Sequence, residues 1–304
     1  MVSCTSDNKT QSEPHIKFIN GYTNNRLEIL DCGGEGRTIL LLAGLGNTAH
    51  VFNDFAPRFT DSFHVLALTR RGFGKSQPSS GYDLTALTGD ILSVLDSLHI
   101  EKIILAGHSV AGEEITKFAV LYPERVDKVI YIDAAYDRTG MDSLLRDMPA
   151  RPQPKTQDSA SLENLQKYYT SLNGVAMPDE EIKETSIFSK DGRYVKDVTA
   201  DSIIGAIIGG TIHPEYTKVK CPALAIYAVN SSVANMIPFY ATLDSVNVLK
   251  ANRMFDGFSR AAIQERIRFK KEVQNSVVAE IKDGHHYLFI SNAEEIARLI
   301  RNFL

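Results

Sequence analysis

Strand-like apolar runs that alternate with helical patterns limit the folds open to this chain more than any other feature. Residues 38–43 read TILLLA, a continuous apolar run typical of a strand buried on both faces of a sheet. Five further runs carry the same signature, at residues 63–68, 102–106, 128–132, 223–228 and 277–281. Between the runs, apolar residues recur every three or four positions, for example from Leu84 to Leu98. This alternation predicts βαβ units and an α/β fold whose mostly parallel sheet is covered by helices on both faces.

Two more strands are expected before the first of these runs. Residues 15–22 and 26–32 alternate between apolar and polar side chains, with a turn at residues 23–25. Together with the six apolar runs they make an eight-stranded sheet. The first 14 residues are polar and lack periodicity, so we expect a flexible tether there, since chain ends are usually disordered unless they are held down.

The alternation breaks between residues 139 and 218. Three prolines introduce a polar stretch without a clear buried strand. A structureless loop of this length is improbable inside a compact domain. Three candidate helices lie within it, at residues 162–172, 180–188 and 202–208. We therefore predict a helical cap at residues 139–218, inserted into a core formed by residues 15–138 and 219–304.

The composition argues against several classes of protein. The 304 residues are 43% hydrophobic and 23% charged, as in an ordinary globular protein. The net charge is −4 and no basic cluster exceeds two residues, so we expect no nucleic-acid partner. Three cysteines, Cys4, Cys32 and Cys221, are too scattered for a disulfide framework or a zinc site. No apolar run approaches the length of a membrane span.

The first residues resemble the processed end of a bacterial lipoprotein signal. Val2 and Ser3 precede Cys4, and a polar stretch follows as far as Pro14. The apolar part of such a signal is missing, so Met1 would be a start placed just before the processed end. The resemblance implies a lipid on Cys4 and a place in the bacterial cell envelope; without it, the expected location is the cytoplasm.

Ser109 is the strongest candidate for a catalytic residue. It lies in the sequence Gly-His-Ser-Val-Ala, residues 107–111, between a predicted strand and a helical pattern. A nucleophile elbow requires this context and small residues two positions to either side of the serine. Gly107 meets that need, and Ala111 is one methyl group larger than the usual glycine. The alternative is an ordinary strand-to-helix turn in which Ser109 caps the helix.

A nucleophilic serine needs a base, and the best candidates are His285 and His286. They follow the last predicted strand and precede the last helical pattern, on a loop that can reach Ser109. Among the other histidines, His50 and His213 stay open as alternatives.

With these residues in place, the chain resembles the α/β-hydrolase fold superfamily, and within it a serine esterase with a helical cap. The motifs that carry the resemblance lie, in chain order, at residues 43–46 (AGLG), 71–76 (RGFGKS), 107–112 (GHSVAG), 122–126 (YPERV) and 285–287 (HHY). The resemblance covers about residues 18–304. It is specific for the fold and implies an α/β-hydrolase sheet of eight strands, but it does not specify a substrate.

The resemblance also assigns roles within the site. The closing motif of the superfamily aligns with His286 as the base and His285 as its neighbour. A serine nucleophile implies an ester mechanism without a metal or an organic cofactor. Two further sets of residues would surround the reaction: the oxyanion donors, which are the N–H groups of Leu45 and Val110, and the substrate-binding residues Gly44 and His108.

The acid of the triad is where the chain departs from the commonest pattern. That pattern places an aspartate after the strand at residues 223–228, but no carboxylate follows here until Asp244. Some relatives supply the acid from the end of the preceding strand, where this chain has Asp133. We therefore predict that Asp133 orients the base. Asp137 and Asp256 are the rivals, and a turn-capping role is the other interpretation of Asp133.

The sequence thus predicts a serine hydrolase that cleaves a carboxylic ester or a lactone through an acyl-enzyme intermediate. Two alternatives stay open. One is a carbon–carbon bond hydrolase or peptidase of the same fold, and the other is a non-catalytic ligand-binding or receptor protein. The natural substrate depends on the cap, whose side-chain geometry cannot be read from periodicity.

Overall fold

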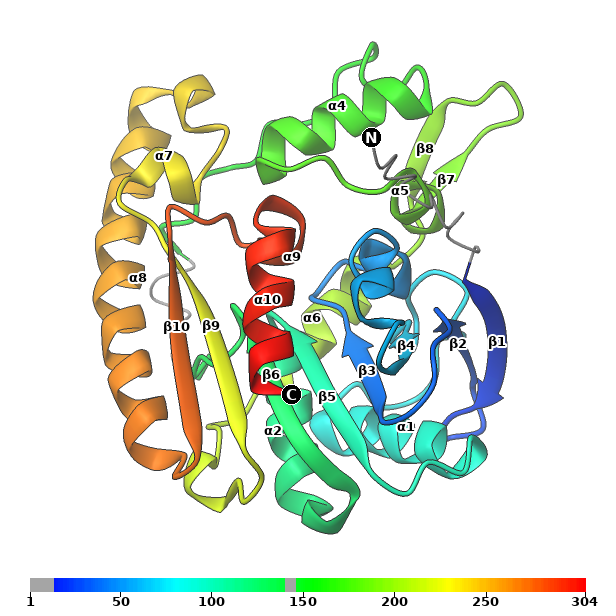
Figure 1. Cartoon of the computed structure of the whole chain (residues 1–304). Coiled ribbons are helices and arrows are strands. Elements are labelled where there is room, and N and C mark those ends of the chain that lie inside the picture. The colour runs from blue at the N-terminus through cyan, green and yellow to red at the C-terminus, as the bar shows by residue number, and fades with distance from the viewer. Residues whose placement is uncertain (1–13, 140–145) are drawn as a thin grey trace, which may run out of the picture.

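The structure, a computed structural model, describes residues 14–139 and 146–304 and is built around one eight-stranded sheet (Figure 1). The strand order is β1-β2-β4-β3-β5-β6-β9-β10. β2 is antiparallel to β1 and β4, and every other neighbouring pair is parallel. The predicted mostly parallel sheet of eight strands is therefore confirmed. The strands are β1 (His15–Asn20), β2 (Arg26–Asp31), β3 (Thr38–Leu42), β4 (His64–Leu68), β5 (Ile103–His108), β6 (Val126–Ile132), β9 (Ala223–Val229) and β10 (Ser276–Lys282).

Each face of the sheet carries its own apolar core, which explains the continuous apolar runs. In β3, Ile39 and Leu41 belong to one core, whereas Leu40 and Leu42 belong to the other. Because helices cover both faces, both alternating sets of side chains leave water. The covering helices are η1 (Ala49–Phe52), η2 (Ala56–Phe59) and α10 (Ala293–Phe303) on the first face, and α1 (Leu84–Ser97) and α2 (Ala111–Leu121) on the second.

The described part of the segment predicted as a cap contains three α-helices, a short 3₁₀ helix at its end and a two-stranded hairpin. The predicted helix over residues 180–188 is wrong at its end, because the last three residues pair with a second strand instead. Neither strand of the hairpin is an apolar run, so no buried-strand signal is visible in the sequence. Figure 1 shows the first two helices and the hairpin above the main sheet. The elements are α4 (Leu162–Asn173), α5 (Asp179–Thr185), β7 (Ser186–Phe188), β8 (Tyr194–Asp197) and α6 (Asp201–Gly209).

The 28-residue helix α8 (Ser245–Glu272) has no counterpart in the sequence prediction. Its buried residues are only Ala251, Met254 and Phe269, so its apolar periodicity is weak. The side chain of Asp244 caps it by accepting a hydrogen bond from the Asn247 N–H at 2.8 Å. The shorter helices are η3 (Pro123–Arg125), η4 (Tyr216–Lys218), α7 (Val233–Met236), η5 (Tyr240–Thr242) and α9 (Leu288–Ser291).

Two of the three cysteines lie within the described residues, and both are free thiols. Burial raises the pKa of Cys32 to about 12 and that of Cys221 to about 11, so neither forms a reactive thiolate near neutral pH. Cys4 and the predicted tether, apart from Pro14, lie outside the described residues, and lipid attachment stays a prediction. Across residues 14–139 and 146–304, no helix is long and apolar enough to cross a membrane.

Helix α2 packs closely against the chain that follows β6 because Gly112 has no side chain. A Cβ atom on Gly112 would lie only 2.1 Å from the carbonyl oxygen of Ala134. That oxygen belongs to the backbone and cannot move without displacing the end of β6. The close approach fixes the start of α2 relative to its neighbouring strand.

We expect Gly112→Ala to destabilise the fold by about 1–3 kcal/mol or more, since the new methyl group must displace backbone atoms. Gly205→Ala is the matched control. Gly205 lies in α6 with no atom near its Cβ position, and alanine there should favour the helix by up to about 1 kcal/mol. Urea denaturation of both variants measures the difference. A Gly112→Ala protein as stable as the wild type would contradict the close packing.

Candidate active site

The loops after four parallel strands bring the predicted catalytic residues to one edge of the sheet. The turn containing Leu45 follows β3, Ser109 follows β5, Asp133 follows β6, and His286 lies on the loop after β10. Because the strands are parallel, their carboxyl ends meet at the same edge, where sites of α/β proteins are built.

Ser109 has a left-handed backbone conformation, with a φ of 54°. Its N–H donates to the carbonyl oxygen of Ile132 at 3.3 Å, which joins the turn to the end of β6. The turn is tight, because a Cβ atom on Gly107 would lie 2.9 Å from the carbonyl oxygen of Ala111. A left-handed residue other than glycine is uncommon, and such conformations gather at functional sites. A strand, a sharp turn at the serine and a helix are the geometry of a nucleophile elbow.

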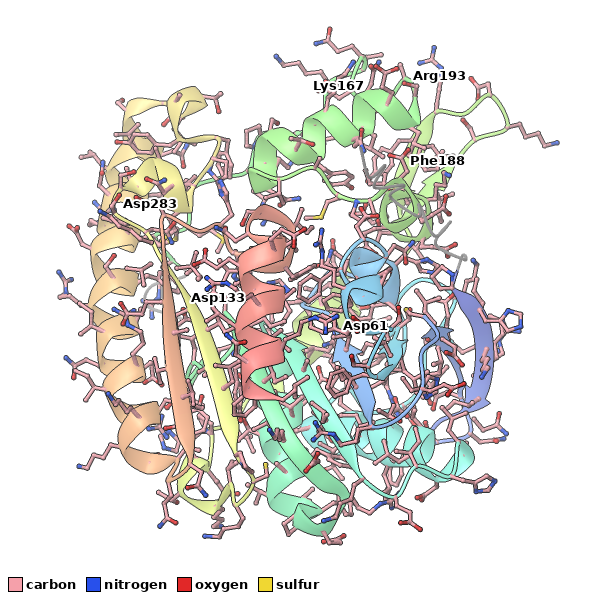
Figure 2. The ribbon with its side chains drawn as sticks, viewed as in Figure 1. Asp61, Asp133, Lys167, Phe188, Arg193 and Asp283 are labelled. Carbon is pink, nitrogen blue, oxygen red and sulfur yellow. The ribbon has the colours of Figure 1, made fainter. Side chains whose placement is uncertain are left out.

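A short hydrogen bond joins Asp133 to His286. His286 Nδ1 lies 2.6 Å from Asp133 Oδ2. The other carboxylate oxygen accepts hydrogen bonds from the Tyr136 hydroxyl at 2.6 Å and the Ala228 N–H at 3.1 Å. Asp133 is 6% exposed, and Figure 2 shows it in the middle of the molecule beside β9. A buried carboxylate with three donors around it can fix the tautomer and orientation of an imidazole.

The base lies close to the elbow without a direct bond to the serine. Among the described residues, the Ser109 hydroxyl donates no hydrogen bond to His286. The ring of His286 is instead 4.5 Å, centroid to centroid, from that of His108, the residue before the serine. The His286 side chain is 48% exposed, which leaves its ring accessible from solvent. Catalytic hydrogen bonds are often long before substrate binds and tighten in the complex.

His108 supports the loop of the base. It is 1% exposed, and its Nε2–H donates to the backbone carbonyl of His286 at 3.0 Å. Burial, reinforced by the nearby His286, lowers the pKa of His108 well below its ordinary value, so the ring is neutral. The structure differs here from the predicted substrate-binding role of His108, because burial leaves its side chain no surface for a ligand.

The loop after β3 forms a tight turn beside the serine. The Asn47 N–H donates to the Gly44 carbonyl at 3.3 Å, and Gly46 has a φ of 86°, as the third residue of a type II turn requires. Gly44 approaches the elbow so closely that a Cβ atom on it would lie 3.1 Å from the Cβ atom of Ser109. The absence of a side chain at Gly44 therefore keeps the turn within reach of the serine.

The N–H groups of Leu45 and Val110 are unoccupied donors beside this serine. Within the described parts of the chain, neither donates a hydrogen bond to another protein atom. Two such donors near a nucleophile can bind a developing oxyanion. The side chains of both residues belong to an apolar cluster, here called the α6 cluster. Its other members are Phe73, Tyr82, Ile203, Ile204 and Ile207.

The rival acids are placed differently from Asp133. Asp137 lies 2.6 Å from His213 Nδ1 and 3.1 Å from Arg268 Nη1, so its carboxylate is already paired. Asp256 is exposed on α8. Of the two histidines in the closing motif, His285 packs against the end of α4, since a Cβ atom on Gly174 would lie 2.7 Å from its ring.

Glu181 anchors α5 to the turn after β3. It is 2% exposed and accepts hydrogen bonds from the Asn47 side-chain amide at 2.9 Å and the Thr48 N–H at 3.1 Å, and also from the Thr48 hydroxyl. Asn47 in turn accepts a hydrogen bond from the Tyr287 hydroxyl at 3.2 Å. One polar network, buried around Glu181, therefore joins α5, the turn and the loop that carries His286.

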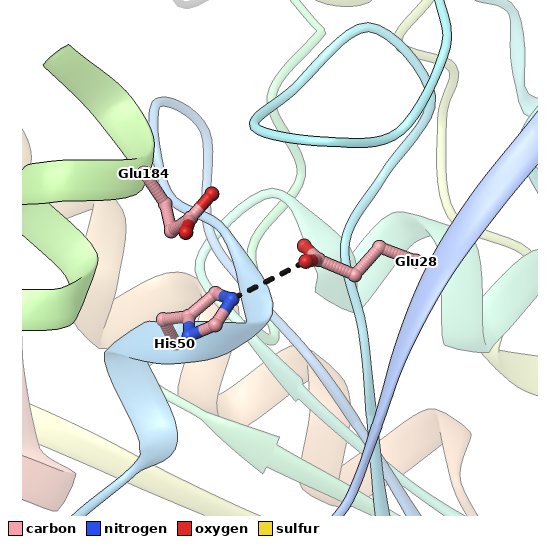
Figure 3. A group of neighbouring side chains, drawn as sticks. All are labelled: Glu28, His50 and Glu184. Atoms are coloured by element: carbon pink, nitrogen blue, oxygen red, sulfur yellow. Dashed lines mark hydrogen bonds and ion pairs between the residues drawn. The ribbon is translucent and has the colours of Figure 1, made fainter. Parts of the chain in front are cut away.

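A second polar contact joins α5 to the core one helical turn further on. Figure 3 shows His50, Glu28 and Glu184 gathered as a triangle, with His50 Nε2 3.4 Å from Glu28 Oε1. The ligand atoms of these three residues lie within 4.8 Å of one another, which is a spacing that a metal ion could use. However, Lys75 Nζ lies 2.5 Å from Glu184 and 4.0 Å from Glu28. The lysine ammonium already offsets the carboxylate charge, so we assign this cluster as an ion-pair network.

Known proteins resemble the chain in sequence. The model of a family described as alpha/beta hydrolase fold matches residues 37–173. A 2-hydroxy-6-oxononadienedioate/2-hydroxy-6-oxononatrienedioate hydrolase from Paraburkholderia phymatum is 28% identical over 246 residues, which are 75% of this chain and 82% of that protein. The chain has the α/β-hydrolase fold. Together with its relatives in sequence, this fold supports its assignment as a hydrolase.

Solved structures of the same fold span nearly the whole hydrolase. The crystal structure of E-2-(acetamidomethylene)succinate hydrolase matches it with a TM-score of 0.66 and 17% identity, over 95% of this chain and 98% of that chain. The structure of the esterase RhEst1 from Rhodococcus sp. ECU1013 matches with a TM-score of 0.62 and 15% identity, over 95% and 98%. At these identities, the likeness shows the fold.

The buried carboxyl of Glu181 should make the stability of the hydrolase depend on pH. Burial raises the pKa of Glu181 from 4.5 to about 7, although its hydrogen bonds to Thr48 and Asn47 oppose the rise. The folded state therefore binds this proton more tightly than the unfolded state does. The resulting stabilisation is fully present below pH 4.5 and is lost as the pH rises to about 7.

We expect Glu181→Gln to remove this pH dependence, since glutamine does not titrate. The unfolding free energy of the wild type, relative to that of Glu181→Gln, should fall between pH 5 and about 7 and then level off. Urea denaturation across this range measures it. Glu180→Gln is the control, because Glu180 is an exposed neighbour on α5 that pairs with Lys183. A difference between wild type and Glu181→Gln that stays constant with pH would show that Glu181 does not titrate there.

Proposed function

We propose that this hydrolase cleaves a carboxylic ester or a lactone through an acyl-enzyme intermediate on Ser109. The observation that carries the proposal is the 2.6 Å hydrogen bond between Asp133 and His286, at the sheet edge where Ser109 stands in a left-handed turn. A serine, a histidine and an aspartate in these roles perform acyl transfer on several unrelated folds.

In the proposed reaction, Ser109 Oγ attacks the carbonyl carbon while His286 Nε2 takes the hydroxyl proton. The N–H groups of Leu45 and Val110 stabilise the resulting oxyanion, and loss of one such donor costs roughly 3–4 kcal/mol in other enzymes. His286 then gives the proton to the leaving alcohol, and the acyl group remains on the serine. Water attacks this ester with His286 as base, the acid is released, and the serine regains its proton.

The apolar side chains of the α6 cluster favour the binding of an apolar substrate. The side chains of Leu45 and Val110, whose N–H groups would hold the oxyanion, pack with three isoleucines of α6 and with Phe73 and Tyr82. The part of the substrate next to the reacting carbonyl would therefore contact apolar side chains. Burial of each methylene group against them contributes about 0.8 kcal/mol to binding.

A carbon–carbon bond hydrolase is the second candidate, and the relative from Paraburkholderia phymatum favours it. The substrate in that protein's name has hydroxyl, keto and carboxylate groups but no ester, so its hydrolysis must break a carbon–carbon bond. The name also specifies a dicarboxylate, whereas the α6 cluster consists of apolar and aromatic side chains. We therefore rank the ester or lactone first. No contact among the described residues favours a peptidase or a receptor.

A substrate panel separates these candidates. It contains p-nitrophenyl esters of short and medium acyl chains, simple lactones, a 2-hydroxy-6-oxo-dienedioate and a peptide anilide. Turnover of esters or lactones supports the proposal, and turnover of the dienedioate alone replaces it with the second candidate. Labelling of the protein by a fluorophosphonate without turnover of any substrate would contradict both and would favour a receptor.

Ser109→Ala and His286→Ala should abolish ester turnover, because the first removes the nucleophile and the second removes its base. His285→Ala is the matched control and should retain activity, since His285 packs against the end of α4. Rates with the best ester and covalent labelling by a fluorophosphonate measure the effect, with circular dichroism to verify folding. Full activity in folded Ser109→Ala would end the proposed mechanism, and a dead His285→Ala beside an active His286→Ala would exchange the two histidines.

Asp133→Asn should lower kcat by about 10⁴-fold, as loss of the orienting carboxylate does in serine proteases. The fold should survive, because asparagine keeps the shape of the side chain. Asp137→Asn tests the nearer rival acid and Asp256→Asn the more distant one, and both should keep most of the activity. Steady-state kinetics of the three variants decide the point. Wild-type turnover by Asp133→Asn would assign the acid elsewhere.

A further inference from the structure

Arg70 lies buried beneath the turn that carries one of the proposed oxyanion donors. It is 6% exposed and follows β4. Its Nη2 donates to the carbonyl of Ala43 at 2.8 Å, and its Nη1 donates to the carbonyl of Gly44 at 3.3 Å. Both carbonyls belong to the loop after β3, so the guanidinium holds the backbone of that loop directly.

The Gly44 carbonyl and the Leu45 N–H belong to the same peptide unit. A trans peptide is planar, and its C=O and N–H groups point in opposite directions. Whatever fixes the carbonyl therefore fixes the direction of the N–H. Here Arg70 and the N–H of Asn47 both donate to the Gly44 oxygen at 3.3 Å, so the Leu45 N–H is directed away from them.

Glu114 links the same guanidinium to the helix of the elbow. One of its carboxylate oxygens accepts hydrogen bonds from Arg70 Nε at 2.8 Å and from Nη2 at 2.5 Å. Burial raises the pKa of Glu114, and the positive charge of Arg70 opposes that rise. Glu114 lies on α2, which begins directly after Val110. The pair thus connects the two segments whose N–H groups must converge on a single oxygen.

We propose that Arg70, held in place by Glu114, is a positioning residue that directs the Leu45 N–H toward the oxyanion. This inference rests on the proposed function, because it concerns how one of the proposed donors is oriented. Donors to an oxyanion are effective when they are already oriented before charge develops. Arg70 should therefore stabilise the transition state more than the bound substrate. Its replacement should then affect kcat more than KM.

The neighbouring pair of Arg71 and Asp90 offers a matched comparison. Arg71 is also buried, and its Nε and Nη2 each donate to the Asp90 carboxylate at 2.6 Å. Its remaining contacts are the carbonyls of Ser80, Gly81 and Ala86, none of which belongs to the turn after β3. Both arginines are buried and paired with a carboxylate, but only Arg70 contacts the turn after β3.

Arg70→Lys tests the inference. Lysine keeps the charge, but a single ammonium cannot reproduce the planar fork that serves Glu114 and two carbonyls together. We expect kcat for the best ester to fall by about 10- to 100-fold, somewhat less than the loss of a whole oxyanion donor. KM should stay within about threefold, as for an interaction made only in the transition state. Affinity for a boronic acid, whose serine adduct is tetrahedral, should fall by a factor similar to that in kcat.

Arg71→Lys controls for the loss of a buried ion pair. It should lower the urea midpoint as Arg70→Lys does, yet keep kcat of the folded protein within about twofold of wild type. If Arg70→Lys does not fold, Glu114→Gln decides by the same criteria, because it removes the charge that holds the guanidinium against the two carbonyls and keeps the shape of the side chain. An unchanged kcat, or an equal loss in Arg71→Lys, would overturn the inference. A wild type that hydrolyses no ester would instead count against the proposed function.

Discussion

The left-handed backbone of Ser109 is the constraint to which the rest of the site is fitted. The turn is possible because Gly107 has no side chain to meet the first turn of α2, and because Gly112 lets that helix lie against the end of β6. Asp133 ends β6 beside this turn and is itself left-handed, with a φ of 47°. The acid and the nucleophile therefore leave adjacent parallel strands, and only the base has to arrive from a more distant loop.

Buried polar contacts hold the surroundings of the elbow. Three polar contacts converge on the turn after β3: Arg70 from the loop after β4, Glu181 from α5 and Tyr287 from the loop of the base. A buried charge without partners is costly, and breaking a buried pair typically costs 3–5 kcal/mol, so such contacts require specific geometry. Apolar burial can tolerate small shifts, whereas these hydrogen bonds cannot. The turn is thus linked to three parts of the chain that are remote in sequence.

A structural feature can be predicted from the sequence when the residues that cause it lie close together in the chain. The strands and the elbow are visible in the sequence because burial on both faces of a sheet, and a sharp turn, select residue types over a few positions. Asp133 can be predicted from the sequence because it directly follows a recognisable strand. Helix α8 and the hairpin of β7 and β8 were missed, since both bury little apolar surface. Arg70 and Glu181 bond to residues 26 and 134 positions away, and no local pattern marks such partners.

Rapid-quench mass spectrometry during turnover of the best ester tests the central claim most directly. The peptide that contains Ser109 should gain the mass of the acyl group within the first turnover and lose it when the ester is exhausted. Asp133→Asn should accumulate the adduct more slowly, because the base that activates the serine is no longer oriented. Steady turnover with the acyl group on another residue, or with no acylated peptide at any time, would contradict a nucleophilic role for Ser109.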